Sequence, residues 1–297
     1  MAAVRLKYLF AIFLYGTIGF FLRYVTVPTE IVVFFRAFIG FLTLLVIMRI
    51  RHVQLNRQGI KEHFKYLVLS GICLGFNWVF LFAAYMHTTV AIASLCNYMA
   101  PIIVIIVAPF LLSESINIRK IGCVIVALTG MVFLSGILSG TEQHANPVGI
   151  ALGLGAACCF VGLVIFNRKV KGVSFYDRSV VQLATSAVIV LIYAVAVNLG
   201  KEIHVDLRSV LIILMLGILH TGIAYCYYFD GMARLPLTTY AVLGYFEPVV
   251  SVLCSVFLLH EKMTLGGLCG TVMIIMAALM SELLTNAQGP FAGEEAV

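Results

Sequence analysis

The chain has 297 residues, of which 62% are hydrophobic and 11% are charged, and its formal net charge is +6. A soluble domain of this length would carry far more charge on its surface, so the composition excludes an ordinary soluble protein. The mean hydropathy of +1.09 favours a bundle of membrane-spanning helices, and strands of alternating polar and apolar residues, as in a membrane barrel, are not recognisable.

Ten apolar runs are long enough to cross about 30 Å of hydrocarbon as helices, which takes roughly 20 residues each. In chain order the predicted spans are 8–25, 30–50, 66–86, 90–112, 117–138, 148–168, 177–198, 208–230, 237–259 and 264–284. The connections are short, so we expect no inserted soluble domain. The first run lacks a cleavage pattern of small residues after it, and we interpret it as a retained helix rather than a signal peptide.

Lysine and arginine collect in alternate connections. Fourteen of the nineteen lie on the side of the N-terminus, four lie on the opposite side, and Arg36 lies inside a span. Because basic connections stay in the cytoplasm, we expect both termini to be cytoplasmic. The lipid bilayer accounts for this bias, so the charge requires no nucleic-acid partner. The basic bias and the short polar tail favour a prokaryotic inner (plasma) membrane, with a eukaryotic membrane as the alternative.

One sequence unit is used twice. Each copy has an apolar run with a central proline, a tyrosine three residues before the proline and a glutamate thirteen residues after it. These residues are Tyr98, Pro101 and Glu114 in the first copy and Tyr245, Pro248 and Glu261 in the second, 147 residues later. A duplicated hydrophobic unit with a proline in the middle of a span is typical of transporters.

The duplication predicts the architecture. Residues 1–142 form the first five-helix repeat, residues 143–284 form the second, and 285–297 are a flexible tail. Because five is an odd number, the second repeat enters the membrane from the opposite side. We therefore predict an all-α polytopic membrane protein in which ten transmembrane helices form two inverted five-helix repeats around a central cavity.

Several short motifs add a family resemblance. The first span carries Y-G-T-I-G-F from Tyr15, followed by Arg23, and the second carries Arg36 in F-F-R-A-F. The fourth and ninth runs end in L-L-S-E and L-L-H-E, and Glu247 directly precedes the proline of the second copy. In this order and spacing the motifs resemble those of EamA-type transporters of the drug/metabolite transporter superfamily. Ser113 and His260 replace the glycine that is usual before the glutamate.

The resemblance extends over residues 5–284. It implies a ten-helix carrier and leaves the cargo open, because members of that family export amino acids and other metabolites and their relatives carry nucleotide sugars or small phosphorylated compounds. Fold analogy alone does not identify a substrate.

The two prolines are predicted to kink their helices. Each removes a backbone hydrogen bond and frees the carbonyl four residues earlier, which belongs to Asn97 for Pro101 and to Gly244 for Pro248. In lipid a free carbonyl must face a neighbouring helix or a wet cavity. The kinks could bend the helices around a binding site, or they could be packing kinks.

Glu247, Arg36 and His220 are ionisable side chains that lie well inside predicted spans, away from the span ends. Glu247 is the candidate for proton coupling or for binding a substrate amine; alternatively it pairs with Arg36 or is a protonated acid that caps the kink. Arg36 could bind a carboxylate or phosphate, or could reach a backbone carbonyl or the membrane surface. His220 could relay a proton, or could be a hydrogen-bonded core histidine.

Aromatic residues recur at matched positions of the two copies. Trp78 corresponds to Tyr225, and Tyr98 corresponds to Tyr245. If they point inward, they form an aromatic cavity with few polar anchors, which suits an amphipathic solute. The residues predicted to line the cavity are Tyr15, Arg36, Asn77, Trp78, Asn97, Tyr98, His220, Tyr225 and Tyr245.

Cysteine and glycine are interpreted as packing residues. The eight cysteines all fall in apolar runs without metal-ligand spacing, so we expect neither a metal site nor a cofactor. Paired glycines such as Gly71 and Gly75 permit close contact between helices, within one chain or in a homodimer.

The function that fits best is secondary transport. We expect an exporter of small metabolites, most simply amino acids or related amphipathic compounds, that works by alternating access. The alternatives are a nucleotide-sugar, sugar-phosphate or drug transporter of the same superfamily and, with less support, a membrane-embedded enzyme. No phosphate-binding G-x-x-x-x-G-K-[ST] loop occurs, so ATP-driven pumping by this chain is not expected.

Overall fold

The computed structural model describes residues 2–88, 90–112, 118–134, 146–258, 260 and 265–286. These residues are helical apart from their connections. The helices are α1 (Ala2–Leu22), α2 (Thr29–Ile50), α3 (Arg57–His87), α4 (Val90–Asn97), α5 (Ala100–Leu111), α6 (Ile118–Leu134), α7 (Pro147–Lys169), α8 (Phe175–Asn198), α9 (Leu207–Met215), a π-helix (Leu216–Ile223), α10 (Ala224–Arg234), α11 (Leu237–Gly244), α12 (Phe246–Leu258) and α13 (Leu265–Asn286).

Seven helices or continuous helical stretches of the described chain are long and apolar enough to cross a membrane, and three shorter apolar helices lie at Ile92–Val104, Ile121–Phe133 and Leu265–Ala277. Many large apolar side chains also remain exposed, for example Phe110 at 83% and Leu265 at 83%. Exposed apolar surface of this extent fits lipid rather than water. The chain is therefore a multi-pass integral membrane protein.

Several helices begin at residues whose side chains cap them. Asn56 accepts a hydrogen bond from the backbone N–H of Gly59 at 2.9 Å, Asn146 accepts one from Val148 at 2.9 Å, and Ser174 accepts one from Asp177 at 3.1 Å. A capping side chain satisfies one of the backbone donors that a helix start leaves unpaired. These caps fix where α3, α7 and α8 begin.

The two prolines interrupt their helices rather than bend them. The helix preceding Pro101 ends at Asn97, and the helix preceding Pro248 ends at Gly244, with a turn before the next helix begins. Each proline then lies in the first turn of the following helix, where a missing backbone N–H costs nothing. The predicted fourth and ninth runs are thus the pairs α4 and α5, and α11 and α12.

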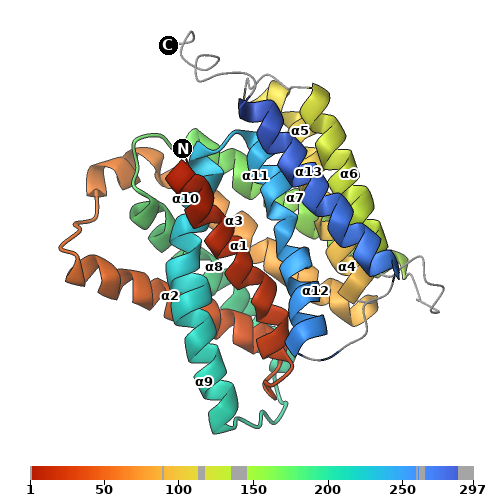
Figure 1. Cartoon of the computed structure of the whole chain (residues 1–297). Coiled ribbons are helices and arrows are strands. Elements are labelled where there is room, and N and C mark those ends of the chain that lie inside the picture. The colour runs from red at the N-terminus through yellow and green to blue at the C-terminus, as the bar shows by residue number, and fades with distance from the viewer. Residues whose placement is uncertain are drawn as a thin grey trace.

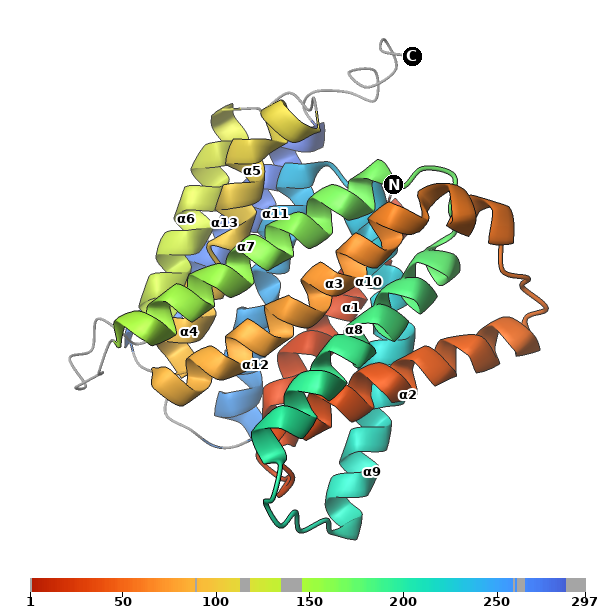
Figure 2. The same ribbon diagram turned by 180° about the vertical axis from the view of Figure 1, so that it is seen from behind.

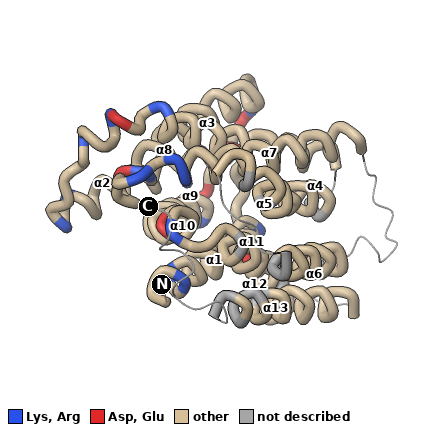
Figure 3. Tube along the Cα trace, turned by 90° about the horizontal axis from the view of Figure 1, so that it is seen from above, with Lys and Arg blue, Asp and Glu red and all other residues tan. Residues whose placement is uncertain are grey.

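The helices pack in a regular pattern. Helix α3 packs between α7 and α8, and Figure 2 shows these three helices side by side on one face of the molecule. On the opposite face α1 packs against α10 and α12, and α6 packs against α13 (Figure 1). Figure 3 looks onto the end of the bundle where the N-terminus lies, and it shows Lys and Arg around that end and on the connection between α2 and α3.

Glycine pairs are used for contacts within the chain. A methyl group added at Gly71 would lie 2.7 Å from Cβ of Thr185, and one added at Gly75 would lie 2.7 Å from Cβ of Ile189, both on α8. The pair therefore lets α3 and α8 approach closely. A homodimer through other surfaces remains a prediction.

Candidate functional site

A central cavity of about 730 Å³ lies among α1, α2, α3, α7, α10 and α12 and the turn after α4. Its volume is in the range of ligand pockets, about 300–1,000 Å³. The cavity extends from Arg23 and Thr29, at the connection between α1 and α2, to Glu247 in the first turn of α12. The predicted site residues that line it are Tyr15, Arg36, Asn77, Trp78, Asn97, Tyr98, Tyr225 and Glu247.

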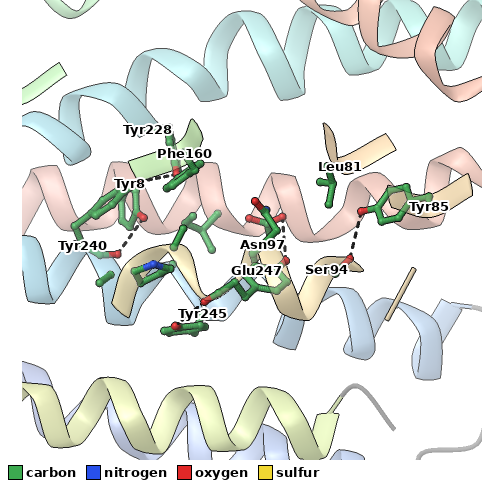
Figure 4. A pocket seen from close by; sticks show the side chains of 16 residues that line it. Tyr8, Leu81, Tyr85, Ser94, Asn97, Phe160, Tyr228, Tyr240, Tyr245 and Glu247 are labelled. Atoms are coloured by element: carbon green, nitrogen blue, oxygen red, sulfur yellow. Dashed lines mark hydrogen bonds between the residues drawn. The ribbon is translucent and has the colours of Figure 1, made fainter. Parts of the chain in front are cut away.

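A smaller cavity of about 160 Å³ adjoins the first and shares seven lining residues with it, among them Asn97, Tyr98 and Glu247. Tyr245 and Pro101 line this smaller cavity only. Figure 4 shows Asn97 and Glu247 in its middle, where the two cavities meet. Glu247 is therefore the acid at the junction between them.

Glu247 is held where α1 crosses α12. The Tyr98 hydroxyl donates to Glu247 Oε1 at 3.5 Å, which is long for a hydrogen bond. A methyl group added at Gly16 would lie 2.6 Å from the carbonyl oxygen of Glu247. Only glycine allows α1 to come this close to the start of α12, and this contact closes one side of the cavity.

Arg36 reaches the cavity from α2 and is 9% exposed. Its guanidinium carbon lies 5.2 Å from the centroid of the Trp78 ring, a cation–π distance. Its Nε has no hydrogen-bond partner among the described residues. Arg36 and Glu247 both line the central cavity. Among the residues that the structure describes, no direct ion pair joins them.

Aromatic rings form the wall beside Arg36. The Trp78 and Tyr225 ring centroids are 5.9 Å apart at an interplanar angle of 80°, and the Tyr15 and Tyr225 centroids are 5.5 Å apart. Edge-on contacts of this kind are favourable for aromatic pairs. The matched positions Trp78 and Tyr225 thus contact each other on the cavity wall.

Asn77 and Asn97 tie three segments together at the cavity. The side-chain amide of Asn77 donates to Oδ1 of Asn97 at 2.9 Å and to the carbonyl oxygen of Ala156 at 2.8 Å. Asn77 is 4% exposed, so these hydrogen bonds satisfy a polar group that would otherwise be costly to bury. They join α3, the end of α4 and α7.

The interruptions of the two duplicated runs face each other. The Tyr245 hydroxyl donates to the backbone carbonyl of Tyr98 at 3.0 Å, and the two ring centroids are 6.4 Å apart. The second interruption thus supplies a hydrogen bond to a carbonyl of the first. Pro248 itself lines neither of the two cavities.

His220 lies in the π-helix and lines neither cavity. Its Nε2 is 2.9 Å from Oγ1 of Thr17, whose hydroxyl is 2.7 Å from the carbonyl oxygen of Leu14. The Thr17 hydroxyl and His220 Nε2 share a hydrogen bond, in which the donor is set by the tautomer of His220. In this arrangement His220 joins the π-helix to α1.

Three buried tyrosines that the sequence did not single out for the site close the smaller cavity toward the N-terminal end of α1. They are Tyr8, Tyr228 and Tyr240 (Figure 4). Tyr8 donates to the carbonyl oxygen of Tyr240 at 3.2 Å, and the hydroxyl oxygens of Tyr228 and Tyr240 are 2.7 Å apart. No spacing or repeat relates them in the sequence, so only the fold could bring them together.

The remaining candidate groups of the sequence add no residue to the site. Glu114, Glu261 and the tail from residue 287 lie outside the described residues. Among the residues that the structure describes, no group of three or more His, Cys, Asp or Glu side chains is placed to hold a metal ion.

Similar proteins are known. The uncharacterized transporter YxxF of Bacillus subtilis is 24% identical over 285 residues, which cover 96% of this chain and 90% of YxxF. The pseudopaline exporter CntI of Pseudomonas aeruginosa strain PAO1 is 31% identical over 146 residues, 49% of each chain. One solved crystal structure shares the fold with a TM-score of 0.82 at 22% identity, over 96% of this chain and 99% of that one.

The family is shown by the sequence as a whole. Two stretches of the chain, residues 6–136 and 147–283, each match the model of one family. Together they cover nearly the whole of the described helices and both sides of the central cavity. The chain therefore belongs to the EamA-like transporter family.

Proposed function

We propose that this protein is a secondary carrier that exports amino acids or related amphipathic metabolites by alternating access. The observation that carries the proposal is the central cavity, which has an aromatic wall, one buried cation at Arg36 and one acid at Glu247 that are not paired with each other. A compound with apolar and charged parts fits such a lining. Export is the direction named for the relative CntI, which matches half of this chain.

The proposed mechanism rests on two inverted repeats of five transmembrane helices, residues 1–142 and 143–284. Helix α1 packs against α10 and α12, and α7, which begins 145 residues later, packs against α3 and α5 in the corresponding way. The two family matches support the same division. Repeats of this kind can rock about a central site and expose it to each side in turn.

In this proposal the basic end of the bundle and both termini are cytoplasmic, in a prokaryotic inner (plasma) membrane. The central cavity then reaches toward the outer side, through the connection between α1 and α2, and the tyrosines Tyr8, Tyr228 and Tyr240 close it from the cytoplasm. Export requires this tyrosine layer to open in the alternate conformation.

A sugar-phosphate cargo is less well supported by the cavity. Its lining includes two cationic side chains, Arg23 and Arg36, and one acid, Glu247. A phosphorylated compound carries several negative charges and is usually bound by clustered cations without an opposing carboxylate.

Transport can be tested with the purified protein in liposomes. Counterflow of a panel of amino acids and other metabolites is measured with and without a pH gradient, for the wild type and for Glu247→Gln. Glu62→Gln is the matched control, because Glu62 is an exposed acid near the start of α3. Uptake of an amphipathic amino acid that loses its pH dependence only in Glu247→Gln supports the proposal with Glu247 as the proton site. Absence of uptake for every amino acid would contradict the proposed cargo.

A further inference from the structure

Two buried polar atoms beside the central cavity have no hydrogen-bond partner among the described residues. They are Nε of Arg36 and the hydroxyl oxygen of Tyr15. Both side chains line the cavity, and Arg36 is more than nine-tenths buried. Because buried polar groups in proteins are almost always hydrogen-bonded, two such atoms in one cavity wall indicate that a ligand completes them.

The aromatic contacts hold these two atoms on the same wall. The Tyr15 and Trp78 rings both pack against Tyr225, at centroid distances of 5.5 and 5.9 Å. The guanidinium of Arg36 lies over the Trp78 ring. The N–H groups of a guanidinium point outward in the guanidinium plane, so a group on the ring face leaves them free to bind a ligand. A guanidinium fork and a hydroxyl together are suited to a carboxylate, which accepts several hydrogen bonds.

The opposite charge lies elsewhere in the same cavity. Glu247 and Arg36 line the same cavity, yet the two form no direct ion pair in the described part of the chain. Burying two opposite charges apart is costly unless each has a counter-charge. A ligand with one positive and one negative group would supply both.

We propose that Arg36 and Tyr15 form a carboxylate subsite and that the transported compound is a zwitterion, which rests on the proposed function above. Its carboxylate accepts hydrogen bonds from the Arg36 guanidinium and the Tyr15 hydroxyl. Its ammonium group faces Glu247, and its apolar part lies against the aromatic wall of the cavity.

The chain contains a single tryptophan, and it is the residue beneath Arg36. Selective excitation of Trp78 fluorescence therefore reports occupancy of this subsite in the full-length protein. Three matched probes are titrated: phenylalanine, phenethylamine, which lacks the carboxylate, and 3-phenylpropionate, which lacks the ammonium group. None of them contains an indole, so the signal comes from Trp78.

We expect phenylalanine to bind and phenethylamine to bind about tenfold or more weakly, since a hydrogen bond to a charged group is lost. Arg36→Gln should abolish that difference, because phenethylamine never used the arginine. Glu247→Gln should instead abolish the difference between phenylalanine and 3-phenylpropionate. Tyr15→Phe should weaken phenylalanine and leave phenethylamine unchanged. These opposite changes in preference would not arise from a general structural defect.

Matched controls exist at an exposed cation–π pair, where the Arg208 guanidinium carbon lies 4.2 Å from the Tyr24 ring centroid. Arg208→Gln and Tyr24→Phe make the same chemical changes outside the cavity and should leave all three affinities unchanged. If Arg36→Gln does not fold, Arg36→Lys keeps the charge and removes the fork, and it should reduce the preference for phenylalanine over phenethylamine.

The outcomes separate this proposal from the proposed function. Equal binding of phenylalanine and phenethylamine by the wild type, or an unchanged preference in both Arg36 variants, overturns the carboxylate subsite while phenylalanine transport stands. If none of the three probes binds and no amino acid of the panel exchanges in liposomes, both proposals are wrong.

Discussion

The hydroxyl of Tyr245 donates a hydrogen bond to the backbone carbonyl of Tyr98 at 3.0 Å, and the two residues are 147 positions apart. Pro101 and Pro248 have the same separation, as do Trp78 and Tyr225, whose rings also contact each other. Corresponding residues of two copies can contact each other only near an axis that relates the copies. These two contacts are thus the strongest geometric support for the proposed inverted repeat.

The hydrogen bond between the two helix interruptions can be removed by deleting one atom, the hydroxyl oxygen of Tyr245. Tyr245 is 1% exposed, and Tyr245→Phe leaves the Tyr98 carbonyl without this donor. We expect a loss of about 1–3 kcal/mol of stability, because an unsatisfied buried carbonyl is costly. The melting temperature in detergent measures the effect. The control is Tyr176→Phe in α8, whose hydroxyl makes no hydrogen bond to the described residues, and an equal shift in both variants would argue against a role for the Tyr245 hydrogen bond.

The crossing of α1 and α12 makes a second prediction. A Cβ atom at position 16 would lie 2.5 Å from Cβ of Val250, so Gly16→Ala must push the helices apart. We expect a loss of about 1–3 kcal/mol, as for other overpacked cores, together with reduced transport. Gly122→Ala on α6 is the matched control, because no atom lies within 4 Å of its added Cβ. A folded Gly16→Ala protein with normal transport would contradict the proposed role of this crossing.

How far the sequence predicts the structure depends on the region. The apolar runs give the helices of the described chain, but α3 begins at Arg57, nine residues before the predicted span, because the helix continues through polar residues that hydropathy does not select. The π-helix was not predicted. A methyl group at Gly217 would lie 2.5 Å from Cβ of Ile39 on α2, so its geometry depends on a tertiary contact.

The same limit applies to the site. The repeat and the family motifs selected residues that do line the cavity, such as Arg36, Trp78 and Glu247. They could not select Tyr8 and Tyr240, which are 232 residues apart and meet only because the fold brings α1 beside α11. The sequence singles out His220 because it is polar inside an apolar run, but it lies outside both cavities, where its Nε2 hydrogen-bonds with its partner Thr17.

That partner gives a third prediction. Thr17→Val keeps the shape of the side chain and removes the hydrogen-bond partner of His220 Nε2, so a buried ring nitrogen is left unpaired. We expect a loss of about 1–3 kcal/mol in stability. Thr129→Val is the control, since its hydroxyl donates only to the Ile125 carbonyl within α6 and is exposed. Equal melting temperatures for the wild type and Thr17→Val would show that the His220 contact is not stabilising.

The fourth prediction concerns pH at Asp206, which lies in the connection between α8 and α9 and contacts Thr26 in the connection between α1 and α2. The pKa of Asp206 lies below its usual value, because hydrogen bonds from the Ser209 hydroxyl and then from the Thr26 hydroxyl, the latter at 2.7 Å, favour its charged form. A carboxyl group with a lowered pKa in the folded state stabilises the fold above its unfolded pKa and ceases to do so as the pH falls through the folded value.

When the pH falls below about 4, the wild type should therefore lose more stability than Asp206→Asn, because only the wild type has the carboxylate to protonate. Melting temperatures measured across a pH series check this. Glu202→Gln, a change of an exposed acid in the same connection, is the control. If the pH profiles of the wild type and Asp206→Asn coincide, the hydrogen bonds at Asp206 do not hold this connection.

The π-helix has a consequence for the alternating access proposed above. Its counterpart by the 147-residue offset lies within α3, which is a continuous α-helix, so the two sides of the cavity are wound differently although their residues correspond. In a carrier built from two identical halves that are related by a two-fold axis, the conformation open to one side would be equivalent to the conformation open to the other. The two conformations would have equal energy. An underwound turn in only one of the described halves removes that degeneracy. For the alternating access proposed above, we therefore expect the empty carrier to rest open to one side, with the contact between the π-helix and α2 contributing to the cost of leaving that state.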